Sequence, residues 1–223
     1  MYILKTHLMK KLYLLFILIL AGQFVFSQLP EVELFYDNFE SGSANWSLNT
    51  SDMGSVGSNG ANQWIINNTY AGGTYNLGGF FPVTIPSTPN QPAQITNSPQ
   101  SQYLHIVCGA ALADGVGNAN FVDGFSSSIV GGEAGANFAK MNVGINTSGI
   151  SDVTLSFWWL CNGAKGSVWY STDGGTSWKD LGANYTNVSN WTFATFVNPE
   201  FDNQADLRFA FMFDNNVSGG DDP

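Results

Sequence analysis

Short apolar segments that alternate with period two are the feature that most restricts the fold of this chain. The clearest case is 207–213, where Leu207, Phe209 and Phe211 alternate with Arg208 and Ala210. This alternation is typical of a half-buried antiparallel strand. We expect further strands at 33–39, 63–66, 79–84, 102–108, 136–143, 153–161, 167–171 and 191–197. Clusters of Gly, Asn, Asp, Ser and Pro separate these segments, and no long helical period occurs, so the pattern predicts an all-β antiparallel sandwich or barrel.

The first 27 residues have the layout of a secretory signal peptide. Lys5, Lys10 and Lys11 precede a short apolar run at 12–21, and Ser27 precedes the expected cleavage point. A charged start, an apolar centre and a small-residue cleavage site direct a chain to export. A membrane anchor is the alternative, but the apolar run is shorter than the ~20 residues that span a bilayer. We therefore expect a signal peptide at 1–27, one domain at 28–223, and a secreted or cell-surface protein.

The charge balance narrows the choice of partner. Three of the 7 basic residues leave with the signal, so 4 remain against 17 acidic residues, a net charge of 4 − 17 = −13. A chain this acidic offers no electrostatic footprint for nucleic acid or for an anionic membrane. We expect neither nucleic-acid binding nor membrane insertion after signal cleavage.

The chain has two cysteines, Cys108 and Cys161. In an exported protein they can form a disulfide bond. Alternation places both on apolar strand faces, Cys108 on the side of Ile106 and Cys161 on the side of Trp159, so the two sulfurs could meet between sheets. Two separate buried thiols are the alternative, and the spacing matches no metal motif.

The sharpest local motif is Tyr170-Ser-Thr-Asp-Gly-Gly-Thr-Ser-Trp178, which matches the Asp-box pattern. Side chains of Asp and Ser bond nearby backbone groups and hold a turn, and glycine accepts a positive φ there. The motif therefore predicts a hairpin turn built by Ser171, Asp173, Gly175 and Trp178. Sialidases contain several such boxes and an arginine cluster, whereas this chain has one box and one arginine, Arg208.

Catalytic motifs are scarce. His105 is the one histidine after the signal, and alternation directs it away from Leu104 and Ile106, toward solvent or the second face of its strand. The sequence contains no Gly-x-Ser-x-Gly elbow and no His-Glu-x-x-His pair. We expect no catalytic residue in this segment. A glycosidase that acts through carboxylates such as Glu40 or Glu133 is the remaining enzymatic hypothesis.

Four segments together resemble a family of secreted jelly-roll domains. They are Phe35-Tyr-Asp-Asn-Phe-Glu-Ser-Gly42 with Trp46, then 145–158, then the segment that begins at Val168, and finally Leu207-Arg-Phe-Ala-Phe. In their order and spacing they are similar to the MAM-like and cleaved-adhesin-type modules of bacterial surface proteins. The resemblance implies a concanavalin-like β-sandwich and export by the type IX route, within a polypeptide that carries further domains. The family usually ends in an Asp-Asp-Ile-like strand, whereas this chain stops at Asp222-Pro223, so we expect the last strand to be missing.

The same resemblance implies a structural calcium ion. In such domains the Phe-Glu carboxylate of the first strand commonly faces the metal, and the matching residue is Glu40. Calcium takes several oxygen ligands, and carboxylates are among them. The candidate co-ligands are Asp37, Asp214, Asp221 and Asp222, and solvated turn acids are the alternative.

Tryptophans are the candidate ligand-binding residues. Sugar rings stack on flat aromatic faces, with polar groups at the rim. Trp158 and Trp159 are adjacent in an expected strand, so they point to opposite faces, and Trp158 shares its face with Thr154 and Ser156. Either Trp158 is exposed for a ligand, or a loop covers it. We name Trp158 and Trp46 as candidates and expect a non-catalytic binding or adhesion module for a glycan or a surface protein. A structural spacer beside a secreted hydrolase or protease is the second hypothesis.

Overall fold

The computed structural model describes residues 31–50, 61–95, 99–122, 136–162 and 165–214. The chain separates into two compact units, 1–33 and 34–223, and the strands described below all belong to the second. Asp222 and the expected signal peptide lie outside the described residues. Among the described residues, no helix is both long and apolar enough to cross a membrane.

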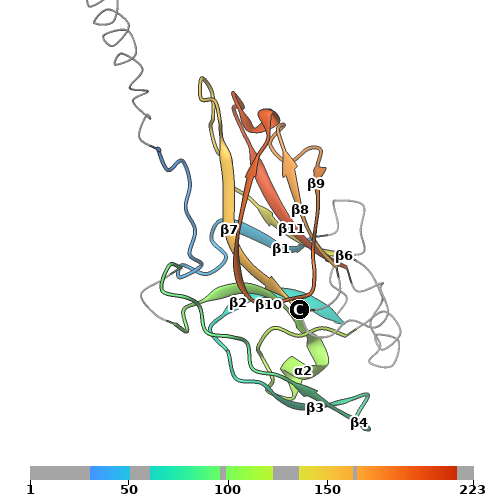
Figure 1. Cartoon of the computed structure of the whole chain (residues 1–223). Helices are drawn as coiled ribbons and strands as arrows, with labels where there is room; N and C mark the ends of the chain where they lie inside the picture. The colour runs from blue at the N-terminus through green and yellow to red at the C-terminus, as the bar shows by residue number, and fades with distance from the viewer. Residues whose placement is uncertain (1–30, 51–60, 96–98, 123–135, 163–164, 215–223) are drawn as a thin grey trace, which may run out of the picture. The chain divides into compact units, whose positions relative to one another are not determined.

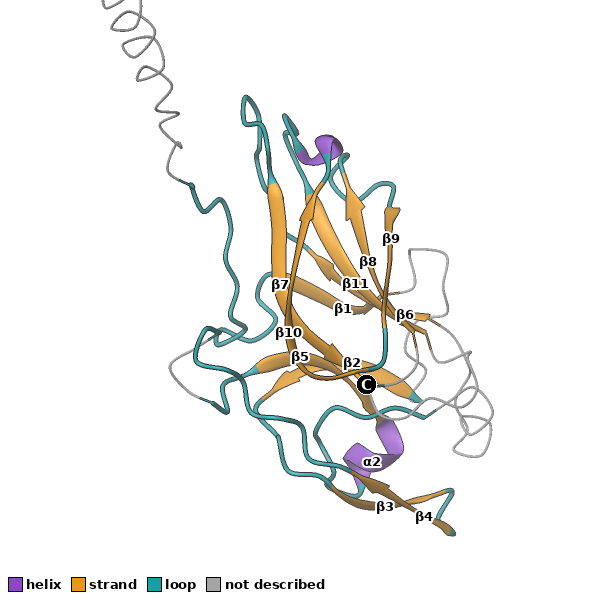
Figure 2. Ribbon diagram, viewed as in Figure 1, coloured by secondary structure: helices purple, strands orange, loops and turns teal. Residues whose placement is uncertain are grey.

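The elements are almost entirely strands (Figures 1 and 2). They are β1 (Trp46–Thr50), β2 (Asn62–Asn67), β3 (Gly73–Leu77), β4 (Phe81–Ile85), β5 (Tyr103–Cys108), β6 (Ala136–Met141), β7 (Thr154–Cys161), β8 (Lys165–Ser171), β9 (Lys179–Tyr185), β10 (Val188–Val197) and β11 (Arg208–Asp214). The helical parts are α2 (Gly109–Ala113) and a single 3₁₀ turn, η1 (Pro199–Phe201). Every strand pair is antiparallel.

Five strands form the main sheet, in the order β1-β6-β11-β8-β9, and the pairs β7–β10, β2–β5 and β3–β4 form three smaller sheets. The β7–β10 pair packs in front of the main sheet (Figure 1). Phe157 of β7 meets Phe211 of β11 edge to face, with ring centroids 5.3 Å apart. Trp159 of β7 meets Tyr185 of β9 in the same way at 4.6 Å. The fold is therefore an all-β antiparallel sandwich, as the sequence predicts, while the jelly-roll strand order stays a prediction.

The main sheet has apolar side chains on both faces, unlike the half-buried strand expected at 207–213. On the inner face, Leu207 and Phe209 join the largest core cluster with Phe201. On the other face, Ala210 and Met212 pack with a second cluster that includes Phe138, Trp169 and Trp178. Both faces of β11 are therefore buried, and the second face is covered by large side chains of β6 and β8 together with Trp178.

One expected strand is wrong, and three strands, β1, β3 and β9, were not expected. Residues 33–39 form no strand, and β1 begins later, at Trp46. Burial alternates with period two in both β3 and β9, but the many Gly, Asn, Lys and Asp residues of these strands weaken the apolar pattern in the sequence. Both are held by pairing with a neighbour, β3 with β4 and β9 with β8.

Candidate functional site

The outer face of the β7–β10 pair carries an aromatic cross-strand pair. Trp158 lies directly opposite Phe193 in the strand register, and the two rings are 5.3 Å apart and inclined at 50°. Phe193 is 53% exposed, and Trp158 is half-buried. Side chains alternate along a strand, so Phe157 and Trp159 point inward and Trp158 points outward. Trp158 is therefore partly covered by Phe193, and the remainder of its ring is accessible to solvent.

Uncharged side chains surround this aromatic pair, and they include the exposed apolar residue Val197, which lies opposite Thr154. Thr154, Ser156 and Thr195 lie on the same face and are exposed. Neither β7 nor β10 contains a charged residue. Flat aromatic rings beside hydroxyl groups can bind a molecule that offers both apolar C–H faces and hydroxyls.

The indole N–H groups distinguish Trp158 from most other tryptophans. Five of the seven indoles donate to acceptors in the described part of the chain, namely those of Trp46, Trp64, Trp169, Trp178 and Trp191. No described residue accepts a hydrogen bond from Trp158. Its indole N–H can therefore donate to solvent or to a ligand.

The prediction that Trp46 binds a ligand is wrong, because this side chain is buried. It is 7% exposed and belongs to the largest core cluster, where it stacks on Phe211 with ring centroids 5.5 Å apart. Its Nε1 donates to Asp37 Oδ2 at 2.9 Å. The tryptophan that follows the Phe-Glu motif is thus part of the core.

Asp37 organises the chain before β1. Its Oδ1 accepts from the backbone N of Phe39 at 2.7 Å, and its Oδ2 accepts from Asn45 Nδ2 at 3.0 Å as well as from Trp46. Phe39 has φ +62°, which is rare for a bulky residue. Three donors on one carboxylate hold this loop in place and account for its failure to form a strand.

The other expected calcium ligands do not gather around Asp37. Glu40 Oε1 accepts from the backbone N of Gln102 at 2.9 Å. Asp214 ends β11, opposite Ala136 and Lys165, while Asp221 and Asp222 lie outside the described residues. Within the described ranges, no group of three or more His, Cys, Asp or Glu side chains could hold a metal ion. Calcium binding by Glu40 stays a prediction.

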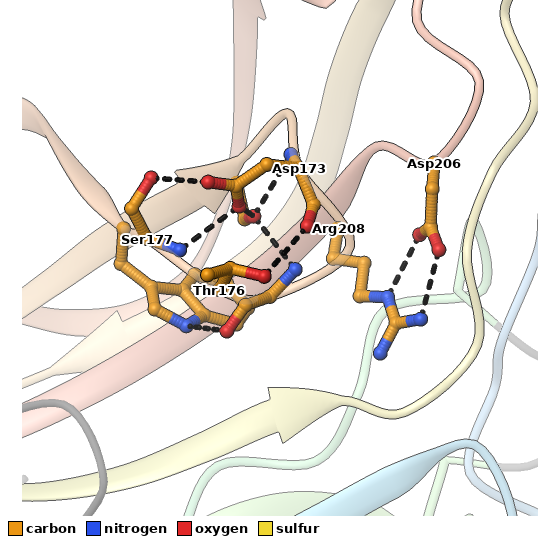
Figure 3. Close-up of polar contacts among 8 residues, drawn as sticks. Asp173, Thr176, Ser177, Asp206 and Arg208 are labelled. Atoms are coloured by element: carbon orange, nitrogen blue, oxygen red, sulfur yellow. Dashed lines mark hydrogen bonds and ion pairs between the residues drawn. The ribbon is translucent and has the colours of Figure 1, made fainter.

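The Asp-box residues form one compact turn between β8 and β9 (Figure 3). Ser171 Oγ accepts from the backbone N of Gly175 at 2.8 Å and donates to Asp173 Oδ1 at 2.7 Å. Asp173 accepts from both the backbone N and the Oγ of Ser177, at 2.9 and 2.6 Å. Trp178 closes the turn, because its Nε1 donates to the carbonyl of Gly175 at 3.1 Å.

The charge of Asp173 is stabilised by these bonds. Hydrogen bonds from the Ser177 hydroxyl, the Ser177 backbone N–H and the Ser171 hydroxyl lower the pKa of Asp173 to about 2. Gly174 and Gly175 have φ of +71° and +88°, which side-chain-bearing residues rarely adopt. The turn is a structural element, and its carboxylate is fully engaged.

An ion pair beside this turn was not expected from the sequence. Arg208 binds Asp206 through Nε and Nη2 at 2.8 and 2.9 Å, and its hydrogen bonds lower the pKa of Asp206 (Figure 3). The carbonyl of Asp206 accepts from the backbone N of Gly174 at 3.3 Å. The single arginine after the signal is thus bound to a carboxylate of the chain itself.

Both cysteines are buried, and both are thiols in the structure. The second alternative, two separate buried thiols, is therefore the one observed. Cys108 packs in a cluster with Tyr75 and Val122, and its Sγ lies 3.9 Å from Tyr75 Oη. Cys161 ends β7 opposite Val188.

His105 lies on the second face of β5, and that face is buried. The residue is 4% exposed and stacks on Tyr103 with ring centroids 4.3 Å apart. Nε2 lies 3.0 Å from Asn67 Oδ1, and Nδ1 lies 3.0 Å from the carbonyl of Ile106. Burial lowers the pKa of His105 to about 4, so the ring is neutral at physiological pH.

No family model matches the chain, and no curated protein or solved structure matches it significantly.

Sequence reasoning missed Phe193, which completes the aromatic pair with Trp158. The signal was present as the alternation of 191–197, but the two residues are joined only by the strand register. Trp158 itself was found because adjacent tryptophans in a strand must face opposite sides.

Proposed function

We propose that this chain is a non-catalytic extracellular binding module whose ligand is an uncharged glycan. The outer face of β7–β10 is the binding surface, with Trp158 and Phe193 as the contact residues. The observation that carries this proposal is an exposed aromatic pair on a face with no charged side chain.

The chemistry of a neutral sugar suits this face. A pyranose ring offers an apolar C–H face to an aromatic ring, and its hydroxyls can bond Ser156, Thr195 or the indole N–H of Trp158. A uronic acid or a sulfated glycan would meet no cation here and would approach a chain with a net charge of −13 after signal removal. The proposal is therefore specific to uncharged polysaccharides.

The wider setting of the module belongs to the same proposal. The signal-peptide pattern at 1–27 supports export, and the resemblance to MAM-like and cleaved-adhesin-type modules supports attachment to further domains at a cell surface by the type IX route. A structural calcium ion held by Glu40 is part of that resemblance. A surface protein is the alternative ligand for the same aromatic pair.

The test is affinity electrophoresis against soluble neutral polysaccharides, such as xyloglucan, mixed-linkage β-glucan and galactomannan, with alginate as the charged comparison. Trp158→Ala and Phe193→Ala should each weaken binding roughly tenfold or more. Each removes an aromatic contact that contributes about 1.5 kcal/mol or more to the binding free energy. Phe193 is the safer position, since 53% of it is exposed and its truncation should affect stability less than that of half-buried Trp158.

Phe80→Ala is the matched control, because Phe80 is 84% exposed and lies in the turn between β3 and β4, away from the β7–β10 face. It should bind glycan like the unmodified protein. Retained binding in both site variants would remove this face from the proposal. An absence of binding to every neutral polysaccharide, with all variants folded, would leave the structural spacer as the better account.

A further inference from the structure

The tip of the β3–β4 hairpin exposes two adjacent phenylalanines. Phe80 is 84% exposed and Phe81 is 59% exposed. Phe80 is the most exposed large apolar side chain among the described residues. The hairpin lies below α2 in Figure 2, on the side away from the five-stranded main sheet. These two rings form a surface separate from the Trp158–Phe193 pair.

The tip is held in this position by the rest of the hairpin. Tyr75 and Ile85 are buried in a core cluster of their own, with Ala111 of α2. Gly78 and Gly79 turn the chain with φ of +60° and +78°. The rings thus project from an anchored turn, so their exposure is a property of the fold.

Two backbone N–H groups of the tip are already paired. Gly79 N donates to the carbonyl of Asn76 at 3.1 Å, and Phe80 N donates to the carbonyl of Leu77 at 3.2 Å. An unpaired N–H group is costly to transfer out of water, whereas a paired one costs far less. The tip can therefore leave water without stranding these two donors.

The sequence around the tip is free of charge. Residues 53–113 contain no Asp, Glu, Lys or Arg. The first charged residue after them is Asp114, whose Oδ2 accepts from the backbone N of Asn76 at 2.9 Å. The two phenylalanines are therefore suited to an uncharged apolar partner, and the carboxylate of Asp114 disfavours an anionic one.

The convex form of the tip decides between the possible partners. A rigid protein surface covers a protruding turn only if it has a pocket of matching shape, whereas the interface of a lipid bilayer deforms around it. We propose that Phe80 and Phe81 are a shallow membrane contact that inserts into the interface of a net-neutral bilayer, such as one of phosphatidylcholine. This contact does not depend on the glycan proposal.

This proposal departs from the expectation of no membrane insertion after signal cleavage. That expectation rested on net charge and on the length of apolar segments, and neither detects two rings at the apex of a turn. Two side chains give weak, reversible binding, since even a single acyl chain binds a membrane only marginally. The contact would therefore add to a second interaction that already holds the protein near the membrane, because the tether raises the local concentration of the two rings at the bilayer.

The test is flotation of the folded protein with phosphatidylcholine vesicles over a series of lipid concentrations. The unmodified protein should float with the vesicles, and the double variant Phe80→Ser with Phe81→Ser should lose at least about tenfold in partition coefficient. Phe193→Ser is the matched control, because it removes an exposed phenylalanine from the other surface and should partition unchanged. Melting temperatures of all variants establish that each is folded.

Several outcomes would overturn the lipid assignment. The first is no partitioning of the unmodified protein at the highest lipid concentration, and the second is equal partitioning of the double variant. A requirement for anionic lipid would also contradict the assignment, since the carboxylate of Asp114, bonded to Asn76 N beside the tip, repels such a surface. Self-association that the double variant abolishes, without vesicle binding, would assign the tip to a second copy of the chain instead.

Discussion

Replacing Asp37 tests whether this carboxylate serves the fold or a calcium ion. In Asp37→Ala, the backbone N of Phe39, Asn45 Nδ2 and Trp46 Nε1 all lose their acceptor. Asn45 is partly accessible and can turn to water, whereas Trp46 is 7% exposed and its indole N–H would be stranded. The cost therefore falls mainly on Trp46 and on the backbone of Phe39.

The size of the effect follows from these contacts. A stranded buried donor costs about 1–3 kcal/mol, and a hydrogen bond to a charged acceptor contributes about 1.5–3 kcal/mol. Allowing for partial compensation by water, we expect a loss of about 3 kcal/mol in the free energy of unfolding. In a domain of this length, each kcal/mol shifts the melting temperature by about 2–4 °C, so the expected decrease is about 6–12 °C.

Urea unfolding and thermal melts, each with and without a chelator, measure the change. If Asp37 acts through its hydrogen bonds, the loss is the same under both conditions. If Asp37 holds calcium, the chelator destabilises the unmodified protein and erases the difference between it and the variant. Asp180→Ala is the control, because Asp180 is exposed, accepts from the backbone N of Gly182 at 2.8 Å, and is not a candidate calcium ligand. A loss below about 1 kcal/mol, or one that disappears with the chelator, would refute the reasoning.

Two further predictions concern His105 and the Asp-box turn. Because burial lowers the pKa of His105 from 6.5 to about 4, the unfolded state takes up a proton first, and stability should fall by roughly 3 kcal/mol as pH decreases from about 6.5 to 4. His105→Gln should flatten that part of the melting profile, and an unchanged slope would contradict the assignment. Ser171→Ala should cost about 1–2 kcal/mol, since Ser171 is 1% exposed and accepts from the backbone N of Gly175. Thr176→Ala, at an exposed neighbour, should cost clearly less in the same urea titration.

Local chemistry is what the sequence predicted best. The turn at 171–178 depends on side chains that bond backbone groups within four residues, so its residue types alone specify it. The strand β11 is similar, because its alternation appears directly in the order of its residues. The opposite orientations of Trp158 and Trp159 follow from the same period.

Strand pairing and side-chain packing decided the features that local sequence patterns did not predict. The segment 33–39 alternates like a strand, yet the carboxylate of Asp37 binds donors up to nine residues away and holds it as a loop. The strand β9 alternates only weakly in apolar character, and its antiparallel pairing with β8 fixes it as a strand. Phe193 and Trp158 are far apart in sequence, and only the register of β10 on β7 brings them together.

The sequence by itself determined that the chain forms antiparallel strands, where its tightest turn lies, and which side Trp158 faces. Only the tertiary structure decided that Trp46 is buried, that the second face of β11 is covered, and that Phe80 and Phe193 are exposed. The physical reason is that alternation and turn chemistry act over a few residues. Burial, by contrast, depends on which distant strand or loop covers a face, and no short pattern in the sequence records that.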